Sequence, residues 1–493
     1  MNFNKKLAVA VSGAVLLMAG QVALADSATD IVDALVMKGV LTEEEGRLIT
    51  KGHTSKTNVT PVLKEKDNNF TIESPNGNNS IGLTGRIHFD YRNYDYDQGN
   101  HAATAASSTG ADTFDMRRAR LGVKYKFAKY YSGEIVFNTV GAVDVLDVAF
   151  LDINWVEKAK IRVGQFKMPM SLEQLTSSNN IDFIERSVLD NYVAAKERGV
   201  QVFGEPATGL TYAVALSNGN AAANQTTGPE GDNKVDNKDV LGRFTINFAE
   251  IMGNKEMVLH AGLALARGEI PYGTGFSASP SAPRTEARGA SYFTAPSLLT
   301  TFASDKAIDR TRVGLEGIIA QGPFKLQGQY LKTNFDFATI TRGYDLDINT
   351  WYAEALWTIT GETHASRYKA GAFGGIKPTK NFDPDTFTGG AWEVGARYSR
   401  IDAKDFDTLG LATGRGTLET AISGTNGVAA SGFTKANSYT AGIKFVANPN
   451  FRVMLDYVHT NWEDPINNVT GINVNGRLET KENALLMRTQ VMF

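Results

Sequence analysis

The segment FDMRRARLGVKYKF, residues 114–127, carries five positive charges in fourteen residues. From Ala119 onward the odd positions are apolar or aromatic, and the even positions are small or basic. A β-strand sends alternate side chains to opposite faces, so this pattern predicts a strand with one apolar face and one cationic face. Guanidinium groups offer forked donors that match phosphate oxygens and stay charged at any relevant pH. The chemistry that such a row could perform is therefore anion binding.

A cationic strand face needs water on one side and an apolar environment on the other. A charged side chain facing lipid costs about 2–4 kcal/mol at mid-membrane, and that cost disappears in a water-filled lumen. From Ile81 onward, sixteen segments keep period-two alternation, with connectors that alternate between short and long. This layout predicts an all-β fold, a transmembrane antiparallel β-barrel of sixteen strands over residues 80–493, with a soluble barrel or sandwich as the alternative.

The strand count depends on one segment. Residues 367–376 (RYKAGAFGGI) are assigned to a connector, because counting them as a seventeenth strand would place the two ends of the barrel on opposite sides of the membrane. Single-chain bacterial barrels have even strand numbers. Sixteen strands enclose an aqueous channel and not a packed core.

The two ends of the chain indicate its destination. Lys5 and Lys6 precede an apolar run, and Ala23-Leu24-Ala25 fits a cleavage site, so residues 1–25 read as a signal peptide. A membrane anchor is the alternative, but polar residues and glycines interrupt a run barely long enough to span. The chain has no cysteine and ends in an alternating segment closed by Phe493. That ending is typical of outer-membrane proteins, and it predicts the Gram-negative outer membrane and the barrel-assembly machinery as a partner.

Residues 26–79 lack this alternation. Ile31, Leu35 and Met37 suit a short amphipathic helix that Gly39 would end, and Thr42 with Glu45 forms a capping-box pattern for a second helix. The sequence therefore predicts a short helical N-terminal periplasmic segment outside the barrel wall.

Several stretches resemble a known family. VGQFK and GAWEVGARYS, together with FIERS, GPFKLQGQY and NPNFRVMLDYVHT, are similar to the phosphate-selective porin O and P family over about residues 80–493. The resemblance implies a sixteen-stranded homotrimeric porin. It also implies an anion path lined by arginines and lysines, with a constriction made by an infolded loop.

Strand parity identifies candidate residues for that path. If the apolar face is taken as lipid-facing, the opposite faces carry sixteen basic and seven acidic residues. The loop expected to form the constriction, residues 168–198, has a net charge of −2. It contributes Arg186, which is expected to meet the ion in the narrow zone; alternatively, Arg186 pairs with Glu185 or Asp182 and only shapes the loop. Arg117 is out of phase, which predicts a strand end or a β-bulge. The candidate anion-path residues are Arg86, Arg92, Arg118, Arg120, Lys124, Lys126, Arg162, Arg186, Arg312, Lys325, Arg397 and Arg452.

These features predict an outer-membrane porin with an anion-selective, water-filled channel for passive uptake of phosphate or polyphosphate. A general diffusion porin with a weak anion preference is the first alternative. An outer-membrane barrel enzyme is the second, but the six histidines are scattered and no Ser–His–acid grouping stands out. The expected partners are inorganic anions and outer-membrane lipid. The sequence indicates no metal, cofactor or nucleic acid.

Overall fold

The computed structural model describes residues 32, 34–49, 60–66, 69–96, 112–140, 145–219, 238–271, 283–294, 307–338, 343–409, 431–466, 471–474 and 477–493. The expected signal peptide, residues 1–25, lies outside the described residues. The chain divides into two compact units, one of residues 1–83 and 124–132 and one of residues 84–123 and 133–493. No helix within the described ranges is long and apolar enough to cross a membrane.

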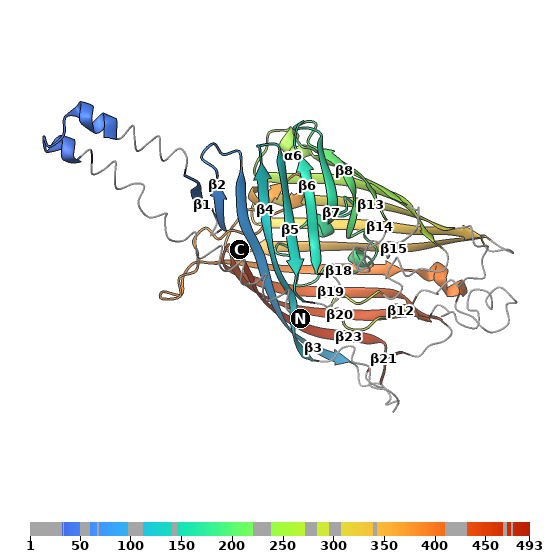
Figure 1. The fold of residues 1–493 in the computed structure, drawn as a ribbon. Helices are drawn as coiled ribbons and strands as arrows, with labels where there is room; N and C mark the ends of the chain where they lie inside the picture. The colour runs from blue at the N-terminus through green and yellow to red at the C-terminus, as the bar shows by residue number, and fades with distance from the viewer. Residues whose placement is uncertain are drawn as a thin grey trace, which may run out of the picture. The chain divides into compact units, whose positions relative to one another are not determined.

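Sixteen antiparallel strands form a closed β-barrel, as the alternation predicts (Figure 1). The last strand pairs with the first from Glu482↔Tyr96 to Met492↔Arg86, which closes the wall. The wall strands are β3 (Ser80–Tyr96), β4 (Thr113–Phe127), β5 (Tyr131–Asn138), β6 (Leu146–Ile153), β7 (Lys160–Lys167), β8 (Lys196–Gly204), β9 (Leu210–Ser217), β10 (Asp239–Asn247), β11 (Met257–Pro271), β13 (Ala307–Gln321), β14 (Phe324–Ala338), β15 (Gly343–Thr358), β18 (Ala391–Asp402), β19 (Ser431–Asn448), β20 (Phe451–Pro465) and β23 (Lys481–Met492).

The outer face of the wall has the pattern of a membrane-spanning barrel. Near the long-loop end, Tyr398 lies 5.0 Å from Tyr439 and 5.1 Å from Trp351 between ring centroids. Near the short-turn end, Phe324 stacks on Trp357 at 6.0 Å. Aromatic girdles at both interfaces, with an apolar band between them, mark the membrane-spanning zone of such barrels.

Three connectors pack against the inward-facing side chains of the wall. The first, residues 168–195, contains α4 (Leu172–Leu175) and the 3-10 helix η1 (Val188–Asn191). The second, described over residues 283–294, ends in β12 (Phe293–Thr294). The third, residues 359–390, contains η4 (Ala365–Arg367) and the hairpin of β16 (Tyr368–Lys369) and β17 (Ala372–Phe373). Residues 367–376 are therefore not a wall strand, as expected. Their connector is long although it lies on the short-turn side.

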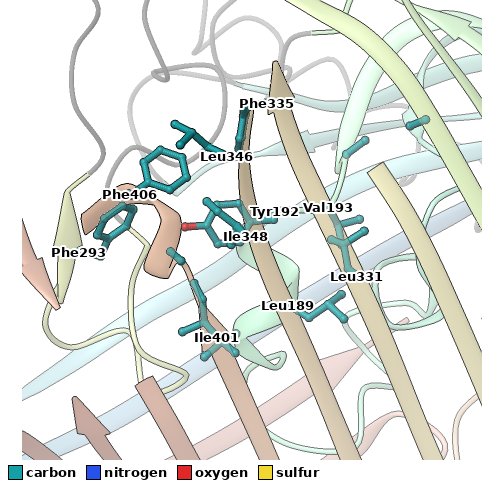
Figure 2. Close-up of a cluster of buried hydrophobic side chains, with 14 of the residues drawn as sticks. Leu189, Tyr192, Val193, Phe293, Leu331, Phe335, Leu346, Ile348, Ile401 and Phe406 are labelled. Carbon is teal, nitrogen blue, oxygen red and sulfur yellow. The ribbon is translucent and has the colours of Figure 1, made fainter. Parts of the chain in front are cut away.

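An apolar cluster fills part of the barrel interior between these connectors and the wall (Figure 2). Phe335 of β14, with Leu346 and Ile348 of β15, packs there against Leu189 and other residues of the connectors. The expectation that apolar positions face lipid is wrong for these strand ends. Loops folded into a barrel must exclude water from their own backbone, so the wall beside them supplies apolar side chains.

The remaining elements are short. β21 (Ile472–Val474) pairs with β22 (Arg477–Glu479), and η5 (Lys404–Leu409) contributes Phe406 to the apolar cluster. On the short-turn side, α6 (Phe248–Ile251) follows β10.

The N-terminal unit contains the expected capping box. Residues 34–37 and 43–49 are helical. The Glu45 side chain accepts from the Thr42 N–H at 2.9 Å, and the Thr42 hydroxyl accepts from the Glu45 N–H at 3.2 Å. The sequence did not predict a β-hairpin of β1 (Val62–Lys66) and β2 (Asn69–Glu73), which pairs with the start of β3 through Thr71↔Gly82. The N-terminal segment is therefore helical only in its first part.

Candidate anion-binding site

Six basic side chains from four neighbouring wall elements and the first infolded connector converge inside the barrel. Each lies within electrostatic range of others in the group. We refer to them as the cationic cluster, which consists of Arg86 of β3, Arg118 and Arg120 of β4, Lys167 of β7, Arg186 of residues 168–195 and Lys196 of β8.

Backbone carbonyl groups hold the side chains of Lys167 and Arg186 in place. Lys167 Nζ donates to the carbonyl oxygens of Gln174, Leu175 and Thr176 at 2.7, 3.2 and 2.9 Å. These carbonyls follow or end α4, where intrahelical partners are missing. Arg186 donates to the Thr176 carbonyl at 3.2 Å and to the Glu173 carbonyl at 2.9 Å. Both cations therefore anchor the connector and keep their charge inside the barrel.

Few carboxylates balance the cationic cluster. Asp147 of β6 accepts from Arg120 at 2.9 Å and also pairs with Lys196. Asp190 approaches Arg186 only to 3.8 Å, and Glu134 interacts with Arg86 over a longer range. Glu185 is also within electrostatic range of Arg118, but it is paired with Arg92 and Arg117. Six cations thus outnumber the carboxylates around them among the described residues, and the cluster keeps a net positive charge.

Arg86 and Arg118 contact neutral groups. Arg86 donates to the hydroxyl of Ser178 at 2.8 Å, and Arg118 lies 3.4 Å from Nδ1 of His88. The Nε atoms of both arginines are buried and have no hydrogen-bond partner within the described residues. Buried N–H groups without an acceptor are costly, so both side chains retain capacity to bind an anion.

Each member of a second set of cations inside the barrel forms an ion pair with a carboxylate. We call it the clamp network, and its ion pairs are Arg92–Asp90, Arg92–Glu185, Arg243–Glu316, Arg310–Asp239, Arg312–Asp239, Lys325–Asp182, Arg397–Glu286, Lys444–Glu393 and Arg488–Asp90.

Solvent exposure differs between several members of the two sets, although Arg118 of the cationic cluster, at 5%, is as buried as Arg243 of the clamp network. In the cationic cluster, the side chains of Arg120, Arg186 and Lys196 keep 14%, 12% and 18% of their surface exposed. In the clamp network, Arg397 and Arg488 keep 2% and 0%. An ion in the lumen can reach these three side chains of the cationic cluster, whereas the cations of the clamp network are occupied by protein carboxylates.

Two glutamates of residues 168–195 illustrate the difference. Burial alone would raise the pKa of Glu185, but Arg117 and Arg92, at 2.7 and 2.6 Å, hold that pKa well below its usual range. Burial raises the pKa of Glu173 to about 7, although Arg397 lies 3.3 Å away and Ser187 donates two hydrogen bonds. Glu185 is a permanent anion of the clamp network, and Glu173 is a group that titrates near neutral pH.

The expected anion-path residues thus fall into separate groups. Arg86, Arg118, Arg120 and Arg186 come together in the cationic cluster. Arg92, Arg312, Lys325 and Arg397 belong to the clamp network, and Arg162 is bound by Asp152 in two hydrogen bonds of 2.6 and 2.8 Å. Arg452 lies apart, buried. Lys124 is exposed and Lys126 is half-buried, and both belong to the other unit.

Arg117 contacts an interior group although it is out of phase. Its Nε donates to Glu185 at 2.7 Å, while the next residue, Arg118, also points to interior groups. Two consecutive inward side chains break the alternation, as expected of a β-bulge.

The alternation of residues along the strands did not predict two members of the cationic cluster, Lys167 and Lys196. Lys167 lies on the odd face of β7, which the alternation assigned to lipid. Gly164 in the same strand has φ +127°, and the consecutive residues Gln165 and Phe166 are both buried, so the alternation fails there. A glycine inside a strand pattern was the available signal. Lys196 was placed in the loop, because the alternation was recognised only from Gly199 onward.

The comparisons with known proteins agree with this architecture. The family model for phosphate-selective porin O and P matches residues 81–493. The chain is similar to Porin O of Pseudomonas aeruginosa, with 24% identity over 418 residues, which cover 79% of this chain and 84% of that protein.

Solved structures with a similar barrel are more distant. The outer membrane channel DcaP of Acinetobacter baumannii has a TM-score of 0.47 at 10% identity, covering 84% of this chain and 97% of that chain. Pseudomonas putida OprB has a TM-score of 0.46 at 10% identity, covering 84% of this chain and 94% of that chain.

Proposed function

Because the chain belongs to the phosphate-selective porin O and P family, we propose that the cationic cluster is the selective site of a passive outer-membrane channel for phosphate. The observation that carries the proposal is a group of six cations, three of them partly exposed, that outnumber the carboxylates around them. Walls of low dielectric focus such a field and raise the local anion concentration. Guanidinium forks favour phosphate oxygens over a spherical halide.

Residues 168–195 act as the constriction of this channel. Their backbone is fixed from several sides, since the Leu172 N–H donates to Glu316 at 3.1 Å and the Ile184 N–H donates to Asp456 at 2.6 Å. Lys325 holds Asp182 at 2.6 Å from another strand. A loop held at many points keeps Arg186 and Lys167 in place while ions pass.

Ion preference in planar bilayers tests the proposal. In a potassium chloride gradient, the reversal potential should have the sign that is expected when chloride is more permeant than potassium. Inorganic phosphate should then block the chloride current at concentrations far below that of chloride. A general diffusion porin would show a small reversal potential and no such block, and that result would overturn the phosphate assignment. Pyrophosphate and longer polyphosphates, run in the same assay, decide how long a chain the site accepts.

We also propose that the protein acts as a channel and not as an enzyme, which its membership of a porin family supports. Absence of hydrolysis of ester and peptide substrates by the purified protein checks this point.

The assembly is a homotrimer inserted by the barrel-assembly machinery. The backbone of Phe493 completes the wall, because its carbonyl accepts from the Gly85 N–H at 2.7 Å and its N–H donates to the Gly85 carbonyl at 3.1 Å. Cross-linking should give a heat-modifiable trimer. Deletion of Phe493 should reduce insertion, and a stable monomer would contradict the assignment.

A further inference from the structure

One connector reaches both the interior of the barrel and its rim. In residues 359–390, the Gly371 carbonyl accepts from Arg243 inside the barrel at 2.8 Å. Farther along the same connector, the Phe382 N–H donates to the Ala447 carbonyl, near the end of β19, at 2.7 Å. The connector therefore joins the lumen to the rim at the short-turn end, which is the periplasmic end in outer-membrane barrels.

A row of four aromatic rings continues from the outer face of the wall onto this connector. Trp392 of β18 and Phe445 of β19 are cross-strand neighbours with ring centroids 4.6 Å apart, and Trp392 is 41% exposed on the outward face. Phe382 lies 5.3 Å from Phe445, and Phe387 lies 6.0 Å from Phe382. A Cβ at Gly390 would lie 2.5 Å from the Phe445 ring, so glycine lets the connector pack against the wall there.

The turn that carries Phe387 is fixed by its own hydrogen bonds. The Asp383 N–H donates to the Thr388 carbonyl at 2.8 Å. The Asp383 carboxylate accepts from the Asp385 N–H at 2.9 Å and from the Thr386 hydroxyl at 2.8 Å. Phe387 is therefore presented by an ordered turn at the rim.

Phe387 combines solvent exposure with an unfavourable backbone conformation. Its φ is +54°, and 82% of its surface is exposed. A bulky residue at positive φ is an outlier, and glycine or asparagine would adopt this conformation at lower cost. Neither the backbone nor packing within the described residues explains a phenylalanine here, and outliers of this kind point to a function.

The surroundings of Phe387 indicate that lipid covers its ring. Aromatic residues of membrane barrels gather where the bilayer meets water, and the stacked pair Phe324–Trp357 lies at the same end of the wall. On the same turn, the exposed Lys380 donates from Nζ to the Thr388 hydroxyl at 3.2 Å. An apolar ring with a lysine beside it in the chain is the combination that binds an interface of acyl chains and phosphate headgroups.

We propose that residues 380–390 form a membrane anchor, in which Phe387 inserts into the headgroup region of the periplasmic phospholipid leaflet. Removal of the ring from water offsets the strain of its backbone. The anchor fixes to the bilayer the connector whose earlier part lies in the lumen. This inference requires only the outer-membrane barrel and does not depend on anion selectivity.

A spin label at position 387 tests the anchor. The chain has no cysteine, so Phe387→Cys carries the only thiol and can be labelled with a nitroxide. The labelled protein is reconstituted into vesicles of phosphatidylethanolamine and phosphatidylglycerol. Oxygen concentrates in lipid, whereas nickel ethylenediamine diacetate stays in water. The nitroxide should collide severalfold more often with oxygen than with the nickel complex.

Two labelled variants serve as matched controls. Asp385→Cys lies on the same turn, keeps the backbone hydrogen bond to Asp383 and should collide mainly with the nickel complex. Leu326→Cys, on the outward face of β14, replaces a side chain that is 53% exposed and should collide mainly with oxygen. All three variants should keep heat-modifiable mobility, because each replaces an exposed side chain, so a folding defect would be visible.

The outcomes decide the inference. A nitroxide at position 387 that is as accessible to nickel as the one at position 385 overturns the anchor. Protection that appears only after soluble periplasmic proteins are added would identify a protein partner, and that result also overturns it. A wild-type channel without anion preference would overturn the proposed function and leave the result for the anchor unchanged.

Discussion

The cationic cluster and the clamp network are built from the same residue types on the same barrel wall, yet their surroundings differ. In the clamp network, Asp239 accepts from both Arg310 and Arg312, at 2.8 and 2.5 Å. In the cationic cluster, Asp147 is likewise shared by two cations, but Arg118 has no carboxylate within ion-pair distance among the described residues. Whether a luminal arginine can bind an ion therefore depends on the number of carboxylates near it and not on its position on the wall.

The two regions also depend on each other. The clamp network fixes the connectors against the wall, because Arg397 donates to both the Glu286 side chain and the Glu185 carbonyl, at 2.9 and 3.0 Å. The same connectors carry Arg186 and the carbonyl groups that orient Lys167. The ion pairs of the clamp network therefore fix the connector that carries Arg186. This explains how the cationic cluster can keep like charges close together.

The largest expected effect comes from reversing charge in the cationic cluster. Arg118→Glu with Arg120→Glu replaces two positive charges by two negative ones. The ratio of chloride to potassium permeability, from the reversal potential in a potassium chloride gradient, should fall about tenfold or more. Phosphate block should weaken in parallel. An unchanged ion preference would show that this strand face does not line the path.

Breaking the clamp network should act on stability and not on charge preference. Glu286→Gln leaves Arg397 without its nearest carboxylate, while Glu173 stays at 3.3 Å. The cost should therefore lie below the roughly 3–5 kcal/mol of a buried pair that loses its only partner. We expect a lower temperature of heat modification and noisier single-channel current, with the sign of the reversal potential unchanged. Arg267→Ala, at an exposed pair of 3.6 Å, is the matched control and should cost about 0–1 kcal/mol.

A pH titration should reveal Glu173. Its pKa is raised to about 7 from an ordinary value of 4.5. As pH falls through 7 the carboxylate is neutralised, so the lumen gains positive charge and anion preference should increase. Between pH 4.5 and 7 the folded protein holds a proton that the unfolded chain has released, so the stability contribution of this group falls as pH rises.

Two substitutions locate that titration. Glu173→Gln should abolish the change in reversal potential between pH 6 and pH 8. Glu185→Gln should keep it, because the pKa of Glu185 lies well below this range. A titration that survives Glu173→Gln would assign it to another group.

The smallest effect is expected outside the barrel. Lys332 and Asp347 form a pair of 2.6 Å on the outer surface of β14 and β15, where Lys332 keeps 42% of its surface exposed. Lys332→Glu should change stability by less than about 1 kcal/mol and leave ion preference unaltered. A clear shift of the reversal potential would mean that outer charges also set selectivity, which would weaken the comparison between the two interior regions.

The sequence by itself determined the wall. Period-two alternation is a local property of each strand, so it predicted sixteen strands, the exclusion of residues 367–376 and the inward direction of Arg86, Arg118 and Arg120. It failed where the backbone departs from a regular pleat, at Gly164 and at Arg117. It also failed at Phe335 and Leu346, where infolded connectors replace water inside the barrel.

Only the tertiary structure decided which luminal cations are free. Glu185 lies 93 residues from Arg92, and Glu286 lies 111 residues from Arg397, yet each pair is in contact. Strand parity places a side chain on a face but contains no information about the loop that folds back onto that face. The strength of a buried charge's interactions depends on the distance to its counter-ion, and that distance is set by how the connectors fold into the barrel.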